Sequence, residues 1–181
     1  TREWTPPHFE KMLYDNARLL KAYSHLKSIE ENSLVNEVVH KTLNFIETNW
    51  YNPEGTFYGN NDVHGEHHYY AENPRPEEKP RIEKTVYTNW NSEAVITYLY
   101  LFQETQDPKY EEMSKKTLDF FNKDLEQGAY HYYINNKKAV RGNLLDNSYL
   151  LLAFIQGYET LNDETYLETS KILADYSLKT L

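Results

Sequence analysis

Three polar side chains near the amino end are spaced so that one face of a helix would carry them all. His8, Lys11 and Asp15 lie at positions i, i+3 and i+7, which an α-helix brings to the same side. Proton abstraction next to a sugar carbonyl needs a group whose pKa lies near the working pH. Histidine suits that task, and a carboxylate can fix its tautomer. His8 and Asp15 are therefore catalytic candidates and Lys11 is a substrate-binding candidate, although the spacing by itself favours a structural role. Alternatively, His8 caps the first turn and Lys11 pairs with Asp15 at the surface.

A second group of candidates lies where the third helix is expected to begin. Trp90 can stack on the face of a sugar ring, and the amide of Asn91 can hydrogen bond to a hydroxyl group. Both are therefore candidate substrate-binding residues. The structural alternative makes Trp90 an apolar plug and Asn91 a helix cap, and for Asn91 we favour the structural interpretation.

A third group lies at the start of the expected fifth helix. Asp146 and Tyr149 are one helical turn apart, and Arg141 lies just upstream. Asp146 is a catalytic candidate, and Arg141 and Tyr149 are substrate-binding candidates. Alternatively, Asp146 only complements the helix dipole, which is worth about 0.3–1 kcal/mol.

One cluster invites assignment as a metal site, but its spacing argues against it. His64, Glu66, His67 and His68 offer imidazole and carboxylate ligands. They match no helix-borne ligand pattern, and the adjacent His67 and His68 would point apart in a strand. The sequence also lacks a phosphate-cradling glycine-rich loop and a nucleophile elbow. We therefore expect neither a metal site nor a cofactor.

Composition limits the class of protein. The 181 residues are 39% hydrophobic, enough to bury one core. A net charge of −9, from 19 basic and 28 acidic residues, argues against nucleic-acid and anionic membrane partners. The absence of cysteine excludes disulfides, thiolate zinc sites and cysteine nucleophiles. No apolar run reaches the roughly 18 residues that span a bilayer, and no signal-peptide pattern is present. We expect a cytoplasmic protein.

Hydrophobic periodicity, caps and prolines predict six helices that pack as three hairpins. The first begins in Pro6 and Pro7 after Thr5, and the second covers residues 33–49. The third begins near residue 91, the fourth at Pro108 after Asp107, the fifth after Asn143 and the sixth near residue 163. In the fifth helix, the predicted apolar stripe consists of Leu145, Tyr149, Leu152, Ala153 and Ile155.

Two segments between these helices are expected to form loops with short strands. Residues 52–87 contain four prolines and three glycines and form a long loop, with residues 56–58 and 68–70 as possible strands. Residues 129–134 and 139–141 flank an Asn-Asn turn and predict a small isolated hairpin. Residues 104–115 also resemble residues 159–171, and such repeated helix pairs indicate a toroid or a solenoid.

Four segments resemble a known family. The motif WTPPHFEKMLYDN at residues 4–16 resembles the signature of the thioredoxin-domain-containing family of spermatogenesis-associated protein 20-like and YyaL-like proteins. GTFYGNNDVHGE at 55–66, KTVYTNWNS at 84–92 and RGNLLDNSYLLLAF at 141–154 resemble further family segments, in the same order. The resemblance implies the C-terminal region of that family, which is related to six-hairpin glycosidases and N-acylglucosamine 2-epimerases.

The chain also departs from the family pattern. No part of it corresponds to the thioredoxin-like domain with its Cys-x-x-Cys motif, Ser92 replaces the expected glycine, and residues 60–64 rewrite an acidic loop. Six helices are half of a twelve-helix toroid, and the chain starts at Thr1 just before its strongest motif. We therefore expect one partial all-α domain over residues 1–181, forming about half of an (α/α)6 toroid with one or two small β-hairpins in its loops. We expect a segment upstream of Thr1. Open apolar edges would favour self-association or contact with missing parts of a longer chain.

The resemblance implies a carbohydrate-active domain similar to N-acylglucosamine 2-epimerases or six-hairpin glycosidases. Such a domain would bind a sugar or another small molecule and perform acid–base chemistry in the central cleft of the toroid. The alternative is a non-catalytic binding or scaffolding module of helix hairpins. An acid and a base that meet in one cavity would favour the enzyme, whereas dispersed polar residues and a large apolar edge would favour the module.

Overall fold

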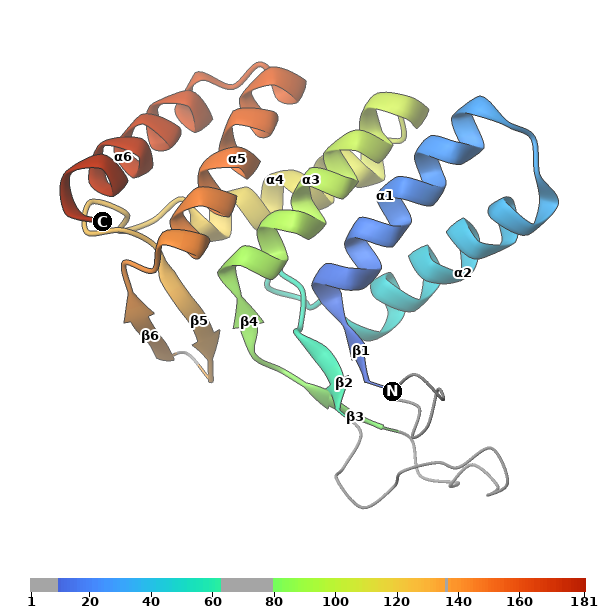
Figure 1. Cartoon of the computed structure of the whole chain (residues 1–181), viewed down its shortest axis with the longest axis horizontal. Helices are drawn as coiled ribbons and strands as arrows, with labels where there is room; N and C mark the ends of the chain where they lie inside the picture. Colours follow the sequence, from blue (N-terminus) through green and yellow to red (C-terminus); the bar gives the residue numbers. More distant parts are fainter. Residues whose placement is uncertain (1–9, 63–79, 136) are drawn as a thin grey trace, which may run out of the picture.

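The computed structural model describes residues 10–62, 80–135 and 137–181 (Figure 1). Within this part of the chain there are six α-helices, each 14–18 residues long. They are α1 (Leu13–Ile29), α2 (Ser33–Asn49), α3 (Thr88–Thr105), α4 (Pro108–Phe121), α5 (Leu144–Leu161) and α6 (Glu164–Thr180).

The helices form three antiparallel hairpins arranged in two rows. Within the hairpins, α1 packs on α2, α3 on α4 and α5 on α6, and α3 also packs against both α1 and α5. Figure 1 shows α1, α3 and α5 side by side with their amino ends toward the strands, while α4 lies behind α3 and α2 and α6 lie at the two flanks. This arrangement is about half of an α/α toroid and confirms the predicted fold class.

The core consists of two clusters that share α3. Ala94, Tyr98 and Leu101 of α3 pack into the first cluster, with α1, α2 and Trp50. Val95 and Leu99 of the same helix pack into the second, with α4, α5 and α6. Because α3 is buried on two sides, apolar residues fill nearly every position of the helix from Ala94 to Phe102. Each fully buried aliphatic side chain stabilises the fold by about 1.5–3 kcal/mol.

Two small antiparallel sheets lie at the amino ends of α1, α3 and α5 (Figure 1). The first has the order β1 (Lys11–Met12), β2 (Asn60–Asp62), β3 (Arg81–Glu83), and the second has the order β4 (Val86–Tyr87), β5 (Tyr130–Ile134), β6 (Lys137–Arg141). The predicted hairpin is confirmed as β5 and β6. The prediction that this hairpin is isolated is wrong, because β4 pairs with β5. Residues 52–87 are likewise not one loop, since their described parts contain β2, β3 and β4.

The first helix begins later than its prolines predict. Lys11 and Met12 are extended because they pair with Asn61 and Asn60, and the backbone N–H of Leu13 donates to the carbonyl of Gly59 at 2.8 Å. The prediction that Lys11 and Asp15 share a helical face is therefore wrong. His8, residues 5–7, the possible strand at 68–70 and the cluster at 64–68 lie outside the described residues.

Other boundaries follow the local sequence signals. The carboxylate of Asp107 accepts a hydrogen bond from the backbone N–H of Lys109 and caps α4, as predicted. Helix α3 begins at Thr88, three residues before the predicted start. Residues 56–58 form no strand, and only Phe57 makes an isolated bridge, with Tyr51.

The predicted apolar stripe of α5 is wrong in part. Leu145 is 50% exposed and Leu152 is 51% exposed, whereas Leu150, Ala153 and Phe154 are buried. The exposed leucines lie on the side of α5 away from the second cluster, so apolar periodicity alone does not separate the core face from the open face. None of the described helices is both long and apolar enough to cross a membrane.

Asn91 ties the loop after α2 to the start of α3. Its fully buried amide accepts from the backbone N–H of Phe57 at 2.8 Å and donates to the carbonyls of Phe57 and Tyr87 at 3.0 and 2.9 Å. We expect Asn91→Ala to lower the free energy of unfolding by about 2–4 kcal/mol, because buried backbone groups lose their partners. Urea unfolding followed by circular dichroism measures this change.

The matched control is Asn49→Ala, which removes a single side-chain contact to the carbonyl of Phe45. We expect that substitution to change stability by less than about 1 kcal/mol. Equal losses in the two variants would contradict the structural role assigned to Asn91.

Candidate functional site

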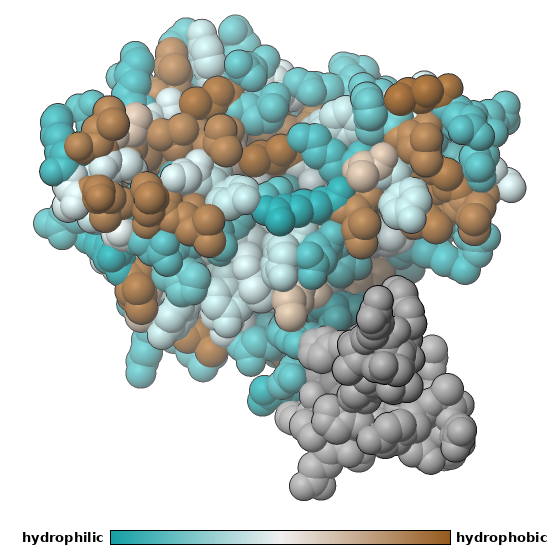
Figure 2. All heavy atoms as spheres, in the orientation of Figure 1, coloured by the Kyte–Doolittle hydropathy of each residue, from teal (hydrophilic) through white to brown (hydrophobic). Residues whose placement is uncertain are grey.

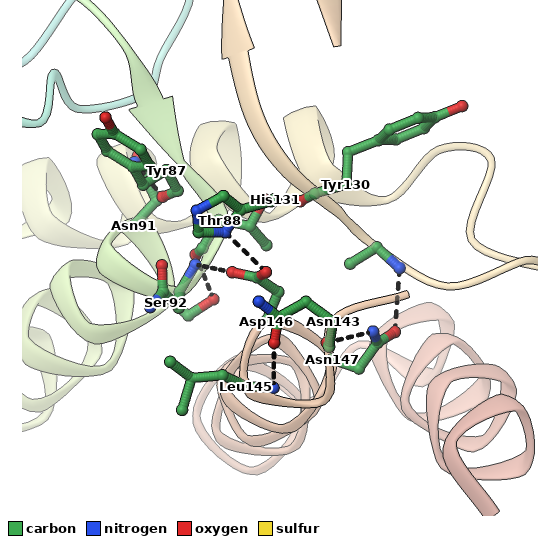
Figure 3. Close-up of polar contacts among 12 residues, drawn as sticks. Tyr87, Thr88, Asn91, Ser92, Tyr130, His131, Asn143, Leu145, Asp146 and Asn147 are labelled. Carbon is green, nitrogen blue, oxygen red and sulfur yellow. Dashed lines mark hydrogen bonds and ion pairs between the residues drawn. The ribbon is translucent and has the colours of Figure 1, made fainter. Parts of the chain in front are cut away.

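A buried carboxylate lies where α3, β5 and α5 meet. Asp146, in the first turn of α5, is fully buried. Its Oδ1 accepts from the backbone N–H of Asn89 at 3.3 Å, and its Oδ2 lies 2.8 Å from Nδ1 of His131 (Figure 3). Burial raises the pKa of Asp146, and the hydrogen bond with His131 opposes that rise.

The contact with Asn89 satisfies a helix end. The N-cap residue of α3, Tyr87, makes no capping hydrogen bond with its side chain, so the first N–H groups of the helix need acceptors from elsewhere. Asp146 supplies one of them from the neighbouring helix. Asp146, which was predicted to complement the dipole of α5, therefore also caps the amino end of α3.

His131 of β5 completes the pair and was not identified from the sequence. Its side chain is 30% exposed. Among the described residues, Asp146 is the one hydrogen-bond partner of its ring. An ionised carboxylate only accepts hydrogen bonds, so Nδ1 of His131 carries the proton of this contact whenever Asp146 is ionised. The ring nitrogen Nε2 then keeps a lone pair and can act as a base.

Buried polar contacts hold this junction together (Figure 3). The hydroxyl of Thr88 in α3 donates to the carbonyl of Tyr130 in β5. Asn147 of α5 accepts from the backbone N–H of Ala129 at 3.0 Å and donates to the carbonyl of Asn143 at 2.7 Å. These bonds attach β5 to the first turns of α3 and α5, so the imidazole and the carboxylate are positioned by regular elements.

Opposite His131, the chain adopts a strained backbone. Val140 lies between two register pairs, Tyr130 with Arg141 and Tyr132 with Ala139, and has φ of 54°. A β-branched residue in the left-handed region costs about 1–3 kcal/mol and is typical of functional sites. The strain lies at the strand position that faces His131 across the ladder.

A row of aromatic rings extends from His131 along the amino ends of α3 and α1. The ring centroid of Tyr87 is 5.6 Å from that of His131 and 4.5 Å from that of Trp90. Trp90 in turn lies 5.1 Å from Tyr14. Rings that are only partly buried offer flat apolar surfaces on which a sugar can stack.

A polar network joins the three neighbouring helices beside this row. Arg18 of α1 donates to the carboxylate of Glu93 of α3 at 2.6 and 2.9 Å and to the hydroxyl of Tyr149 of α5 at 2.6 Å. The guanidinium also lies 5.7 Å from the ring centroids of Tyr14 and Tyr149. A guanidinium group, a carboxylate and a phenol hydroxyl therefore lie together, and the phenol belongs to Tyr149, one helical turn from Asp146.

The structure brings some of the predicted site residues together and separates others. Asp146, Tyr149 and Trp90 lie around the junction, through the contacts with His131, Arg18 and Tyr87. Asp15 lies exposed in the first turn of α1, with no ion pair to any residue in the described ranges.

Three further candidates lie away from the pair. Lys11 lies with its ammonium 5.6 Å from the ring of Phe45 in α2. The polar atoms of Asn91 are used by the fold, which agrees with the structural interpretation. Arg141 binds the carboxylate of Asp124 at 2.9 Å and the carbonyl of Gly128 at 3.0 Å. The described residues contain no cluster of three or more side chains suited to a metal ion.

The architecture is that of α/α toroid enzymes that act on carbohydrates. The chain superimposes on a cellobiose 2-epimerase from Spirochaeta thermophila with a TM-score of 0.71 and 15% identity, covering 91% of this chain and 42% of that one. It superimposes on a D-mannose isomerase with a TM-score of 0.72 and 16% identity, covering 94% and 43%. It superimposes on a glycoside hydrolase family 76 mannosidase from Bacteroides thetaiotaomicron with a TM-score of 0.68 and 11% identity, covering 94% of this chain and 45% of that one. At these identities the likeness establishes the fold alone.

Sequence comparison leads to a particular family. No protein-family model matches the chain. Human spermatogenesis-associated protein 20 is 32% identical over 94 residues, which are 52% of this chain and 11% of that protein. The rat protein of the same name is 36% identical over 62 residues, which are 34% of this chain and 8% of that protein. These matches, together with the shared toroid fold, confirm the resemblance to the spermatogenesis-associated protein 20 family. The matched segments span about a tenth of those relatives.

The contacts of Arg141 lead to a prediction about pH. Hydrogen bonds from Lys138 and Arg141 lower the pKa of Asp124 to about 2. A carboxyl group whose pKa falls on folding stabilises the protein above its unfolded pKa, and this contribution is lost as the pH falls toward 2. We expect Lys138→Gln and Arg141→Gln each to raise the pKa of Asp124 toward its ordinary value, as measured by carboxyl NMR titration.

The control is Lys179→Gln, which removes an ion pair with Asp175 on α6. That substitution should leave the titration of Asp124 unchanged. A midpoint for Asp124 near 4 in the unsubstituted chain would show that these ion pairs do not form in solution.

Proposed function

We propose that the chain contributes to a carbohydrate-active site that transfers protons, in the manner of a sugar epimerase or isomerase. The observation that carries the proposal is the 2.8 Å contact between Nδ1 of His131 and the fully buried carboxylate of Asp146. Support comes from the fold, which the chain shares with proteins named as a cellobiose 2-epimerase and a D-mannose isomerase.

In this proposal His131 moves the proton and Asp146 positions His131. Nε2 of His131 removes a proton from the carbon next to the carbonyl of an open-chain sugar, and the imidazolium that forms is stabilised by Asp146. Positioned acid–base groups contribute about 100- to 10,000-fold to such reactions. Because the reaction needs the proton to return, a second carrier is useful, and His8 and Asp15 remain predictions for that role.

The neighbouring side chains then bind the substrate. Trp90 and Tyr87 offer ring faces for stacking, and Arg18, Glu93 and Tyr149 offer partners for hydroxyl groups. Their three helices lie side by side, so these side chains adjoin one another on the row of α1, α3 and α5 (Figure 1).

We propose further that the open edges of the half-toroid pack against helices that complete it, from a second copy or from the rest of a longer chain. Exposed apolar residues gather over α5 and α6 and over α1 and α2 (Figure 2). They include Leu152 and Leu178 at one edge and Leu19 and Ile29 at the other. A closed hollow would exclude water from the proton transfer. The same edges also favour the alternative, a non-catalytic scaffolding module. A measurement of catalytic activity therefore decides between the two functions.

Incorporation of solvent deuterium at C2 of a sugar tests the proposal. Glucose, mannose, cellobiose and N-acetylglucosamine are incubated with the protein in deuterated buffer, and loss of the C2 proton signal is followed by NMR. We expect exchange in at least one sugar, and we expect His131→Ala and Asp146→Asn to slow it by about 100-fold or more.

The control is His40→Ala, which changes an exposed histidine on α2. It should retain full exchange activity. Thermal unfolding should show that His131→Ala, which leaves Asp146 the N–H of Asn89 as a donor, is still folded at the assay temperature. Absence of exchange in every sugar, or equal activity of the His131 and His40 variants, would support the scaffolding alternative.

A further inference from the structure

A cleft lies beside the β4–β5–β6 sheet, and neither His131 nor Asp146 lines it. Its volume is about 740 Å³, and its walls come from the loop after α2, from β4, from the end of α4 and from the β5–β6 hairpin. Ligand pockets in proteins typically measure about 300–1,000 Å³. The cleft is therefore large enough for a small molecule rather than for a single inorganic ion.

This cleft and the His131 site are built from different residues. Tyr133 pairs with Val86 on one side and with Lys138 on the other, and all three residues line the cleft. Tyr87, whose ring lies beside that of His131, pairs with Tyr132 one position along, and none of these three residues lines the cleft. The two sites share a sheet but no lining residue.

The lining of the cleft is positive although the chain is acidic. Lys84, Lys123, Lys137 and Lys138 line it, with Glu54 as the single acidic residue, whereas acidic residues outnumber basic ones by 28 to 19 in the whole chain. Lys138 pairs with Asp124 at 2.8 Å. No carboxylate in the described ranges forms an ion pair with any of the other three lysines. Like charges gathered in a concave site raise the local potential and attract anions.

The rest of the lining favours a ligand with a ring. Tyr58, Phe120 and Tyr133 contribute aromatic surface, and the ammonium of Lys84 lies 6.0 Å from the ring centroid of Tyr58. Asn135 adds an amide group to the lining, whereas the amide of Asn52 is hydrogen-bonded within its own loop to Glu54 and Thr56. We propose that this cleft binds a small organic phosphate that carries a sugar-like or planar ring, with the phosphate held by Lys84 and Lys123.

Isothermal titration of the 181-residue chain with glucose 6-phosphate, glucose and inorganic phosphate tests the proposal. We expect glucose 6-phosphate to bind at least tenfold more tightly than either of the others, and its affinity to fall as salt is added because charge attraction is screened. The double substitution Lys84→Gln/Lys123→Gln should weaken binding of glucose 6-phosphate at least tenfold.

The matched control is Lys27→Gln/Lys179→Gln, which removes the same charge from exposed lysines at the ends of α1 and α6. It should bind glucose 6-phosphate like the unsubstituted chain. Equal weakening in both double variants would show a general charge effect and overturn the site. Binding of inorganic phosphate as tight as that of glucose 6-phosphate would overturn the role of the ring. Because His131 does not line this cleft, His131→Ala should leave the affinity unchanged even where it abolishes deuterium exchange.

Discussion

A carboxylate can be buried only where hydrogen-bond donors surround it, and this constraint decides how α3, β5 and α5 meet. Asp146 is fully buried, and its two oxygens accept from the first turn of α3 and from His131 of β5. An unpartnered buried charge would cost several kcal/mol. The three elements are therefore held at one point, and the imidazole that satisfies the carboxylate is the group that remains partly open to solvent.

The geometry of a toroid explains why such a junction forms at this end of the molecule. Helices α1, α3 and α5 lie in parallel, so their amino ends and unpaired N–H groups gather on one side, next to both sheets (Figure 1). Carboxylates are favoured there by the helix dipoles. The cleft beside the β4–β5–β6 sheet is instead lined by lysines. One sheet of three short strands thus contributes different residues to a site suited to proton transfer and to a cleft suited to an organic anion.

Local signals in the sequence predict most of the fold. The hydrophobic period gives the bounds of α2, the Asp107–Pro108 pair gives the start of α4, and the Asn-Asn turn gives the β5–β6 hairpin. Long-range pairing accounts for the errors: Lys11 and Met12 follow prolines suited to a helix but pair with β2, 48 or more residues away. In the site, Asp146 was identifiable from its motif and its place in the first turn. His131 was not, because its role depends on a carboxylate 15 residues further on, across a turn and a strand. The alternation of polar and aromatic residues in β5 was its one local signal.

The protonation of the His131 ring tests the central claim most directly. In a ¹⁵N-labelled sample at a pH where the imidazole is neutral, long-range ¹H–¹⁵N correlation spectra distinguish the two tautomers. The account predicts that Nδ1 carries the proton and Nε2 does not, and that Asp146→Asn changes the ¹⁵N shifts of this ring while those of His25 stay the same. A neutral ring protonated at Nε2, or ¹⁵N shifts of His131 that do not change in Asp146→Asn, would show that the carboxylate does not orient the imidazole.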